Sequence, residues 1–255
     1  MTRIFSSALA GCFLFLGSAL NLSANDDSRI FELRTYHASE GKLEALEARF
    51  RDHTTTFFEK YGIENIGYWV PSENADNQFI YILAYPSLEA REASWKAFLS
   101  DPDWKKAKKA SEVDGKLVRK IDSQFMTTTD YSPMLSLQQA DDSRVFELRV
   151  YTSTDGNLAN LDKRFSDATI SLFAKHGMEN LCYWHLTPNQ EGVENTLIYL
   201  LAHKNKEAAQ VSWKGFLSDP EWKAAAAASR VNGRLVVKGG VKSTYLRPLD
   251  FSPLQ

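Results

Sequence analysis

The chain of 255 residues has little cysteine and no excess of either charge. Its two cysteines cannot form a disulfide framework, and neither lies in a C-x-x-C metal or redox pattern. Lys and Arg number 30 against 32 Asp and Glu, which gives a net charge of -2. Proteins that bind nucleic acid carry a basic patch or stripe, so we expect no nucleic-acid partner. The sequence also lacks a Gly-rich phosphate loop, a nucleophile elbow and short metal-ligand spacings, and we therefore expect no cofactor and no bound metal.

Long apolar runs are also missing, except at the N-terminus. Residues 4–20 carry no charge, follow Arg3, and lead through small residues into a polar segment that starts at Asn25. This layout is typical of a secretory signal peptide over residues 1–24, cleaved after Ala19 or Ala24. An uncleaved membrane anchor and a lipid attached at Cys12 are alternatives, but the run is short for a bilayer span of about 30 Å. We expect an exported protein, periplasmic or secreted, without stable membrane insertion after cleavage.

The strongest pattern is internal repetition. Residues 27–36 return as 142–151 with 8 of 10 positions identical, and SWKAFLSDPDWK at 94–105 returns as SWKGFLSDPEWK at 212–223 with 10 of 12 identical. All six tryptophans fall into three pairs between the copies. We therefore divide the chain into a signal peptide, two copies of one domain and a linker, with the bounds 1–24, 25–134, 135–141 (linker) and 142–255.

Each copy has the same pattern of predicted elements. Alternation over 29–36 predicts a half-buried strand, and apolar residues at three- and four-residue steps over 41–61 predict a helix. The remaining elements are a hairpin (65–70 and 78–85), helices from Ser87 and from Pro102, and a strand at 123–129. This β-α-β-β-α-β order is the ferredoxin-like plan, an α+β fold. Each sheet has one uncovered face, so we expect the two antiparallel sheets to face each other as an intrachain pseudo-dimeric α/β barrel.

Several segments form a specific set: FELRTYH, KYGIENIGYW and FIYILAYPSLEAREASWKAFLSDPDW with their second-copy counterparts, including the pattern W-x-x-F-x-x-D-P-x-W. Together they resemble the NIPSNAP family. The resemblance covers both copies and implies membership of the dimeric α/β-barrel superfamily, whose ferredoxin-like sheets face each other. Animal members are associated with mitochondria and with trafficking partners. The apolar N-terminus and the tandem arrangement differ from those members, so these roles are not carried over.

The first candidate site is the polar face of the first strand in each copy. If helices cover Phe31 and Leu33, the opposite face looks into the space between the sheets, where arginines could bind a small organic or anionic ligand. The alternative is that these glutamates and arginines pair with each other, as buried charges require. The face comprises Glu32, Arg34, Tyr36, Glu147, Arg149 and Tyr151.

Three further residues complete the predicted ligand-binding set. His53 lies on the apolar stripe of the first helix between Phe50 and Phe57, where it could be a general base or a hydrogen-bonded core residue. His203 occupies the position of Tyr85 at the end of a repeated strand, and the unequal pair indicates either a specialised half-site or drift.

Two functions fit these observations. We expect a binding or interaction module with a polar cavity between the sheets for a small ligand. The alternative is a cofactor-free enzyme, similar to a monooxygenase or an isomerase, that acts on a small organic molecule. Whether the protein is an enzyme is left open, as are its catalytic residues and its assembly into a homo-oligomer. The enzyme alternative rests on similarity of fold alone, and a fold does not determine a function.

Overall fold

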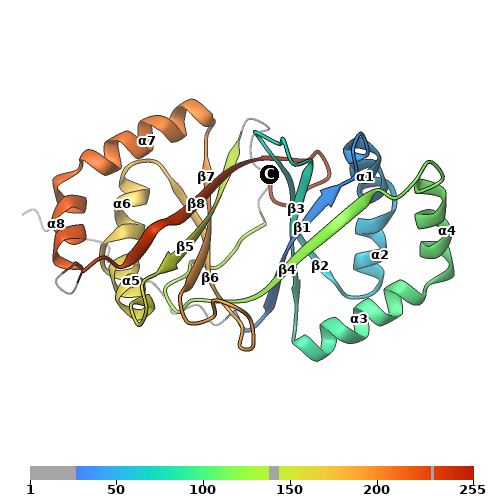
Figure 1. Ribbon diagram of the computed structural model, residues 1–255, viewed down its shortest axis with the longest axis horizontal. Helices are drawn as coiled ribbons and strands as arrows, with labels where there is room; N and C mark the ends of the chain where they lie inside the picture. The colour runs from blue at the N-terminus through green and yellow to red at the C-terminus, as the bar shows by residue number, and fades with distance from the viewer. Residues whose placement is uncertain (1–26, 138–143, 231–232) are drawn as a thin grey trace, which may run out of the picture.

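The computed structural model describes residues 27–137, 144–230 and 233–255. Each half follows the predicted order of elements, and the two halves lie side by side with their helices on opposite outer flanks (Figure 1). The first half contains β1 (Ile30–Ala38), α1 (Leu43–Arg49), the π-helix η1 (Phe50–Thr54), α2 (Thr55–Lys60), β2 (Glu64–Pro71), β3 (Gln78–Tyr85), α3 (Leu88–Ser100), α4 (Pro102–Ser111) and β4 (Val118–Thr128). The second contains β5 (Val145–Ser153), α5 (Leu158–Arg164), the π-helix η2 (Phe165–Thr169), α6 (Ile170–Lys175), β6 (Glu179–Leu186), β7 (Thr196–His203), α7 (Lys206–Ser218), α8 (Pro220–Ala228) and β8 (Val236–Pro248).

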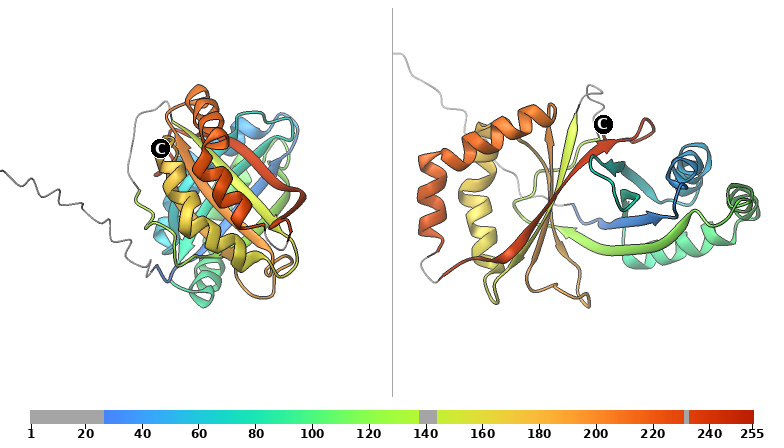
Figure 2. Two further views of the ribbon diagram at one scale, coloured as in Figure 1. Left: turned by 90° about the vertical axis from the view of Figure 1, so that its left-hand side faces the viewer. Right: turned by 45° about the horizontal axis from the view of Figure 1, so that its top comes forward.

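The strands close into one antiparallel barrel in the order β1-β3-β2-β8-β5-β7-β6-β4. Two short ladders join the halves, and they occupy equivalent places in the repeat. In one, Val70 of β2 pairs with Arg247 of β8; in the other, Thr127 of β4 pairs with His185 of β6. The long strands β4 and β8 therefore each leave their own sheet and end on the sheet of the other half (Figure 2). The predicted intrachain pseudo-dimer of facing sheets is confirmed.

The barrel interior is a packed apolar core. Strand residues of both halves meet there, among them Phe31 and Leu33 of β1, Phe146 and Leu148 of β5, and the fully buried Trp69 and Trp184. Phe31 contacts Trp184 and Trp69 contacts Phe146, with ring centroids 5.7 and 5.5 Å apart, so each tryptophan packs across the boundary between the halves. Burying this surface against the other half stabilises the tandem fold.

Helices cover the outer faces of the two sheets. Aromatic residues dominate both outer cores, with Phe50, Phe58 and Phe98 in the first half at positions equivalent to Phe165, Phe173 and Phe216 in the second. The start of α4 follows the sequence prediction, since Pro102 is its first residue and the Asp101 carboxylate accepts hydrogen bonds from the backbone N–H groups of Asp103 and Trp104. The repeated Asp-Pro thus fixes the corner between the two outer helices.

Two elements differ from the prediction. The strand expected at 123–129 begins earlier, since β4 covers Val118–Thr128. The helix expected over 41–61 contains the π-helical segment η1, which has the counterpart η2 in the second half. The Thr54 hydroxyl donates to the Arg49 carbonyl oxygen at 3.1 Å, and Thr169 donates to Arg164 at 3.0 Å. The extra residue in this turn rotates the following residues relative to an ideal α-helix.

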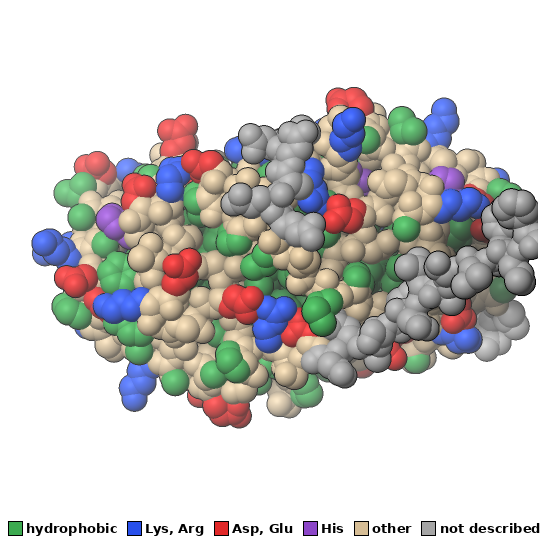
Figure 3. All heavy atoms as spheres, turned by 180° about the vertical axis from the view of Figure 1, so that it is seen from behind, with side chains coloured by type: hydrophobic (Ala, Val, Ile, Leu, Met, Phe, Trp, Pro, Cys, Tyr) green, Lys and Arg blue, Asp and Glu red, His purple; other side chains and the backbone are tan. Residues whose placement is uncertain are grey.

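The predicted signal peptide over residues 1–24 and part of the predicted linker lie outside the described residues. Within the described part, no helix is both long enough and apolar enough to cross a bilayer. Acidic and basic side chains are interspersed with apolar ones over the rear face of the molecule (Figure 3).

Candidate functional site

The polar face of β1 and β5 points toward the helices, so its predicted position between the sheets is wrong. Phe31 and Leu33 belong to the barrel interior, whereas Tyr36 packs with the aromatic residues beneath the helices. The physical reason is that hydrogen-bond and ion-pair partners for these side chains lie on the helix-covered face of the sheet. Between the sheets a charged side chain would meet only apolar residues, while α3 and α7 provide tryptophan rings and hydrogen-bond donors on the other face.

In the first half, five donors surround the buried Glu32 carboxylate. Oε1 accepts from Arg34, from Arg91 Nη2 at 3.0 Å and from the Ser123 hydroxyl at 2.7 Å. Oε2 accepts from the Tyr85 hydroxyl at 2.9 Å and from Arg91 Nε at 3.1 Å. Burial raises the pKa of Glu32, but the hydrogen bond from Arg91 and the charge of Arg34 outweigh that effect and hold the pKa below its usual value. The carboxylate is a structural anion with its acceptor sites filled.

In the second half, Glu147 has a different set of donors. Oε1 accepts from Arg149 and from the Ser243 hydroxyl, both at 2.5 Å. Oε2 accepts from His203 Nε2 at 3.0 Å and from the Trp213 indole at 2.7 Å. Burial raises the pKa of Glu147, but the hydrogen bond from His203 and the charge of Arg149 lower it to about 2.

Two substitutions between the copies account for this difference. His203 stands where the first half has Tyr85, and Ala209 of α7 stands where α3 has Arg91. In the first half the Trp95 indole donates to the Tyr85 hydroxyl at 2.8 Å, whereas in the second the Trp213 indole reaches the carboxylate itself. The copies thus keep the buried glutamate–arginine pair and change the groups around it.

The arginine of each pair lies between tyrosines and a tryptophan. Arg34 Nε donates to the Tyr81 hydroxyl at 2.8 Å, and Nη2 reaches the Tyr36 hydroxyl at 3.4 Å. Arg149 makes the equivalent bonds to Tyr199 and Tyr151 at 2.8 and 3.2 Å. The Arg34 guanidinium lies 4.5 Å from the Trp95 ring centroid, a cation–π distance. The predicted residues Tyr36, Tyr85, Tyr151 and His203 therefore gather with the two glutamate–arginine pairs.

His53 does not belong to this group. It is exposed on η1, so its predicted place on the buried stripe is wrong. The π-helical turn explains the difference, because the extra residue moves His53 outward while Phe50 and Thr54 remain buried.

A cavity lies beside each buried pair, between the sheet and the helices. The first-half pocket has a volume of about 670 Å³ and the second-half pocket about 530 Å³. Equivalent residues line them: Arg34, Tyr36, Arg49, Phe50, Thr54, Phe58, Trp95, Phe98, Leu99 and Trp104 in the first, and Arg149, Tyr151, Arg164, Phe165, Thr169, Phe173, Trp213, Phe216, Leu217 and Trp222 in the second. The ends of both π-helical turns contribute to the walls, as π-bulges often do at functional sites.

Each pocket combines aromatic walls, cationic groups and an apolar rim. Leu99 and Ile121 line the first-half pocket and are 51% and 47% exposed; Leu217 and Val241 line the second and are 57% and 44% exposed. Cations outnumber carboxylates in both linings: the described residues of the first-half pocket include seven Lys and Arg against one Glu, and those of the second-half pocket five against none. The lining is suited to an apolar molecule with a negatively charged group.

Sequence reasoning missed several of these residues. The predicted set does not include Arg91, Arg49 or Arg164, and Trp95 and Trp213 are identified from the sequence only as a repeated tryptophan pair, although both line a pocket. Identity between the copies was the available signal for Arg49 and Arg164, which occupy equivalent positions in the repeat. Arg91 gave no such signal, because its counterpart is Ala209. In the described part of the chain, no three His, Cys, Asp or Glu side chains are placed to hold a metal ion.

A family model named NIPSNAP matches residues 31–133 and again residues 146–253. The chain belongs to the NIPSNAP family. Both matches fall on the halves of the barrel, so the protein carries two NIPSNAP domains in tandem. A search of the curated proteins finds no match.

Solved structures share this architecture at low sequence identity. A candidate monooxygenase from Fusobacterium nucleatum is 14% identical with a TM-score of 0.57, covering 88% of this chain and 93% of its own. One from Lactobacillus acidophilus is 14% identical with a TM-score of 0.55, covering 87% and 94%. A NIPSNAP family protein of unknown function from Agrobacterium tumefaciens is 19% identical with a TM-score of 0.38, covering 46% and 97%. The likeness to the first two structures shows that this tandem NIPSNAP chain shares their fold.

Proposed function

We propose that this tandem NIPSNAP protein is a binding module for small organic anions, with one pocket in each half between the sheet and the helices. The observation that carries the proposal is the duplication of the pocket itself. An arginine stacked on a tryptophan, a ring of aromatic residues and an apolar rim recur at equivalent positions, and the cavity volumes of about 670 and 530 Å³ suit a small molecule.

The chemistry of the lining favours binding over acid–base catalysis. Among the described residues of the second-half pocket there is no His, Cys, Asp or Glu. The one carboxylate of the first-half pocket, Glu112, accepts a hydrogen bond from Arg49 at 3.1 Å. General acid–base catalysis at neutral pH is most efficient with a group whose pKa lies near 7, and neither lining includes a His among its described residues.

We also propose that residues 1–24 are removed during export. The support is the sequence of a basic residue, an uncharged apolar stretch and small residues. Intact mass of the protein recovered outside the cytoplasm should correspond to a start near Leu20 or Asn25. A soluble exported form that retains residue 1 would contradict the proposal.

The tryptophans provide the test of binding. We expect 1-naphthoate to shift the NMR signals of the Trp95 and Trp213 indole N–H groups, which Trp95→Phe and Trp213→Phe would assign. Trp69 and Trp184 serve as internal controls, since both are fully buried in the barrel interior. Shifts confined to Trp69 and Trp184 would place the ligand between the sheets, and no shift at any of the six tryptophans would refute the proposal.

A further inference from the structure

The two pockets differ at one buried arginine. In the first half, Arg49 Nη1 donates to Glu112 Oε1 at 3.1 Å, and the two form an ion pair. The equivalent arginine of the second half, Arg164, is also buried, with 9% of its surface exposed. The residue at the position of Glu112 is Arg230, so the carboxylate of the first half is replaced by a second cation.

Arg164 has no anionic partner among the residues that the structure describes. Its Nε is buried without a hydrogen-bond partner, and its guanidinium lies 5.2 Å from the Trp222 ring centroid. Arg49 has the same buried Nε and lies 5.7 Å from the Trp104 ring centroid, so the two arginines differ in the carboxylate alone. Burial lowers the pKa of Arg164, and the charge of Arg230 lowers it further. An uncompensated buried charge is costly, and the cost disappears when a counter-ion binds.

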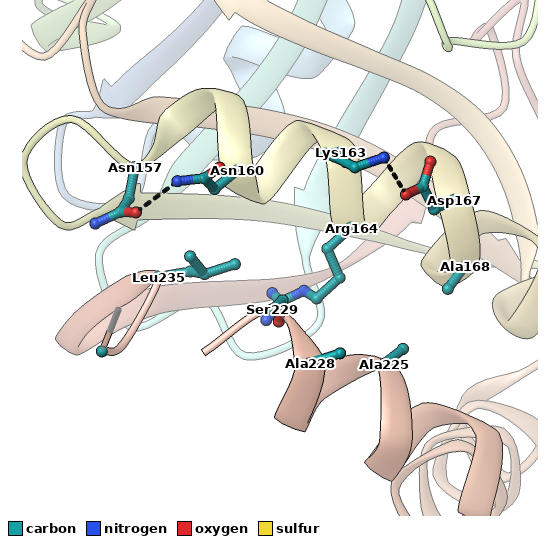
Figure 4. Close-up of a pocket in the computed structure, with 11 residues that line it drawn as sticks. Asn157, Asn160, Lys163, Arg164, Asp167, Ala168, Ala225, Ala228, Ser229 and Leu235 are labelled. Carbon is teal, nitrogen blue, oxygen red and sulfur yellow. Dashed lines mark hydrogen bonds and ion pairs between the residues drawn. The ribbon is translucent and has the colours of Figure 1, made fainter. Parts of the chain in front are cut away.

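The surroundings of Arg164 open toward solvent on two sides. It lines the second-half pocket and also a neighbouring groove of about 410 Å³ between α5 and the end of α8. In Figure 4 the Arg164 side chain extends from α5 toward Ser229 at the end of α8. The groove contains Asp167, but this carboxylate is held by Lys163 at 2.7 Å. Arg230, Arg234 and Lys238 add three cations to the pocket.

We propose that the second-half pocket binds the carboxylate or phosphate group of a small organic anion, with Arg164 as the buried contact and Arg230 and Arg234 at the entrance. The inference rests on the proposed function and makes the halves unequal. The first-half pocket lacks this contact, because Glu112 already neutralises Arg49, and it should bind the same anions less tightly. Arginine suits this role because its planar guanidinium offers paired donors to either oxyanion.

Calorimetric titration of the full chain tests the proposal with two aromatic anions, benzoate and phenyl phosphate, and with neutral benzyl alcohol. We expect two anion sites of unequal affinity that benzyl alcohol does not occupy, with the tighter site in the second-half pocket. The ratio of the benzoate and phenyl phosphate affinities separates carboxylate from phosphate preference. Arg164→Met should weaken anion binding by about tenfold to hundredfold, the usual loss for a hydrogen bond to a charged group. Unliganded Arg164→Met should melt at the same or a higher temperature than the parent, because a buried charge has been removed.

Reciprocal exchanges provide the matched controls. Arg230→Glu recreates the first-half pair and should weaken anion binding at the second-half pocket by about tenfold or more. Glu112→Arg should tighten anion binding at the first-half pocket, since it leaves Arg49 without its partner. Both exchanges alter positions near the ends of the outer helices, and Arg230 is exposed, so circular dichroism should show an intact fold.

The outcomes separate this inference from the proposed function. Equal anion binding by both pockets, unchanged by Arg164→Met and by Arg230→Glu, would overturn the inference and leave the binding function standing. Absence of binding for 1-naphthoate, benzoate and phenyl phosphate alike would overturn both. A lower melting temperature for Arg164→Met together with unchanged anion affinity would assign Arg164 a purely structural role and refute the inference.

Discussion

Removing the strand arginine should cost more stability in the second half than in the first. Arg34→Met and Arg149→Met keep an apolar stem of similar length and delete the guanidinium. Glu32 would still be held by Arg91, which donates to both carboxylate oxygens at 3.0 and 3.1 Å. Glu147 would keep neutral Ser243 and Trp213 and the hydrogen bond from His203, and no Lys or Arg among the described residues would contact it.

The magnitudes follow from this difference. Breaking a buried ion pair so that one charge stays behind costs about 3–5 kcal/mol, which we expect for Arg149→Met. Losing one hydrogen bond to a charge that stays compensated costs about 1.5–3 kcal/mol, which we expect for Arg34→Met. The gap of about 2 kcal/mol corresponds to a difference of about 4–8 °C in melting temperature for a chain of this size.

Urea unfolding at pH 7, followed by tryptophan fluorescence, measures both losses. Arg34→Met combined with Arg91→Met should approach the loss of Arg149→Met, because Glu32 then has no cation. The loss in Arg149→Met should shrink as the pH falls, since burial without Arg149 raises the pKa of Glu147 and the protonated form is tolerated. Equal losses for Arg34→Met and Arg149→Met, or a larger loss for Arg34→Met, would refute the reasoning.

Three further predictions concern single side chains. The Glu147 carboxylate contributes stability that is complete above its unfolded pKa of 4.5 and is lost as the pH falls toward its folded pKa of about 2. In Glu147→Gln the free energy of unfolding should therefore decrease less between these two pH values. An unchanged pH profile would contradict the assignment. Gly67→Ala should destabilise by about 1–3 kcal/mol in urea unfolding, because the added Cβ would lie 2.2 Å from the Trp69 ring; no loss would mean that the ring moves freely. Cys182 is fully buried and burial raises its pKa to about 12, so the thiol should react with Ellman's reagent at pH 8 only after unfolding, and rapid reaction of the native protein would contradict this.

Periodicity and repetition predicted the elements and their order well. The strand at 78–85 matches β3, and the facing sheets follow from the need of each copy to cover one sheet face. The orientation of the polar face could not be predicted in the same way. β3 alternates Ile80, Ile82 and Ala84 inward with Phe79, Tyr81 and Leu83 outward, so both faces of the sheet are apolar and the alternation does not say which one the helices cover.

The candidate site was predicted less completely than the fold because its partners come from distant segments. Arg91 lies 59 residues from Glu32 in the sequence, and Ser123 lies 91 residues away. The π-helical turn has no signature in the apolar pattern of 41–61, and it decides that Arg49 and Thr54 face the pocket while His53 does not. Hydrogen bonds between distant strands and the extra residue of a π-helical turn depend on tertiary packing. A local sequence pattern does not predict them.

The two halves have diverged where function permits it and not where the barrel forbids it. Each half must bury one sheet face against the other, so the inward positions stay largely apolar in both copies. The glutamate–arginine pairs on the opposite face of the sheet are also duplicated. The pocket entrances carry no such constraint, and there Glu112 has become Arg230 and Arg119 has become Val237. A homodimer of single domains would change both pockets with every mutation. Joining two copies in one chain allows one pocket to leave its buried arginine without a carboxylate partner while the other keeps its arginine neutralised.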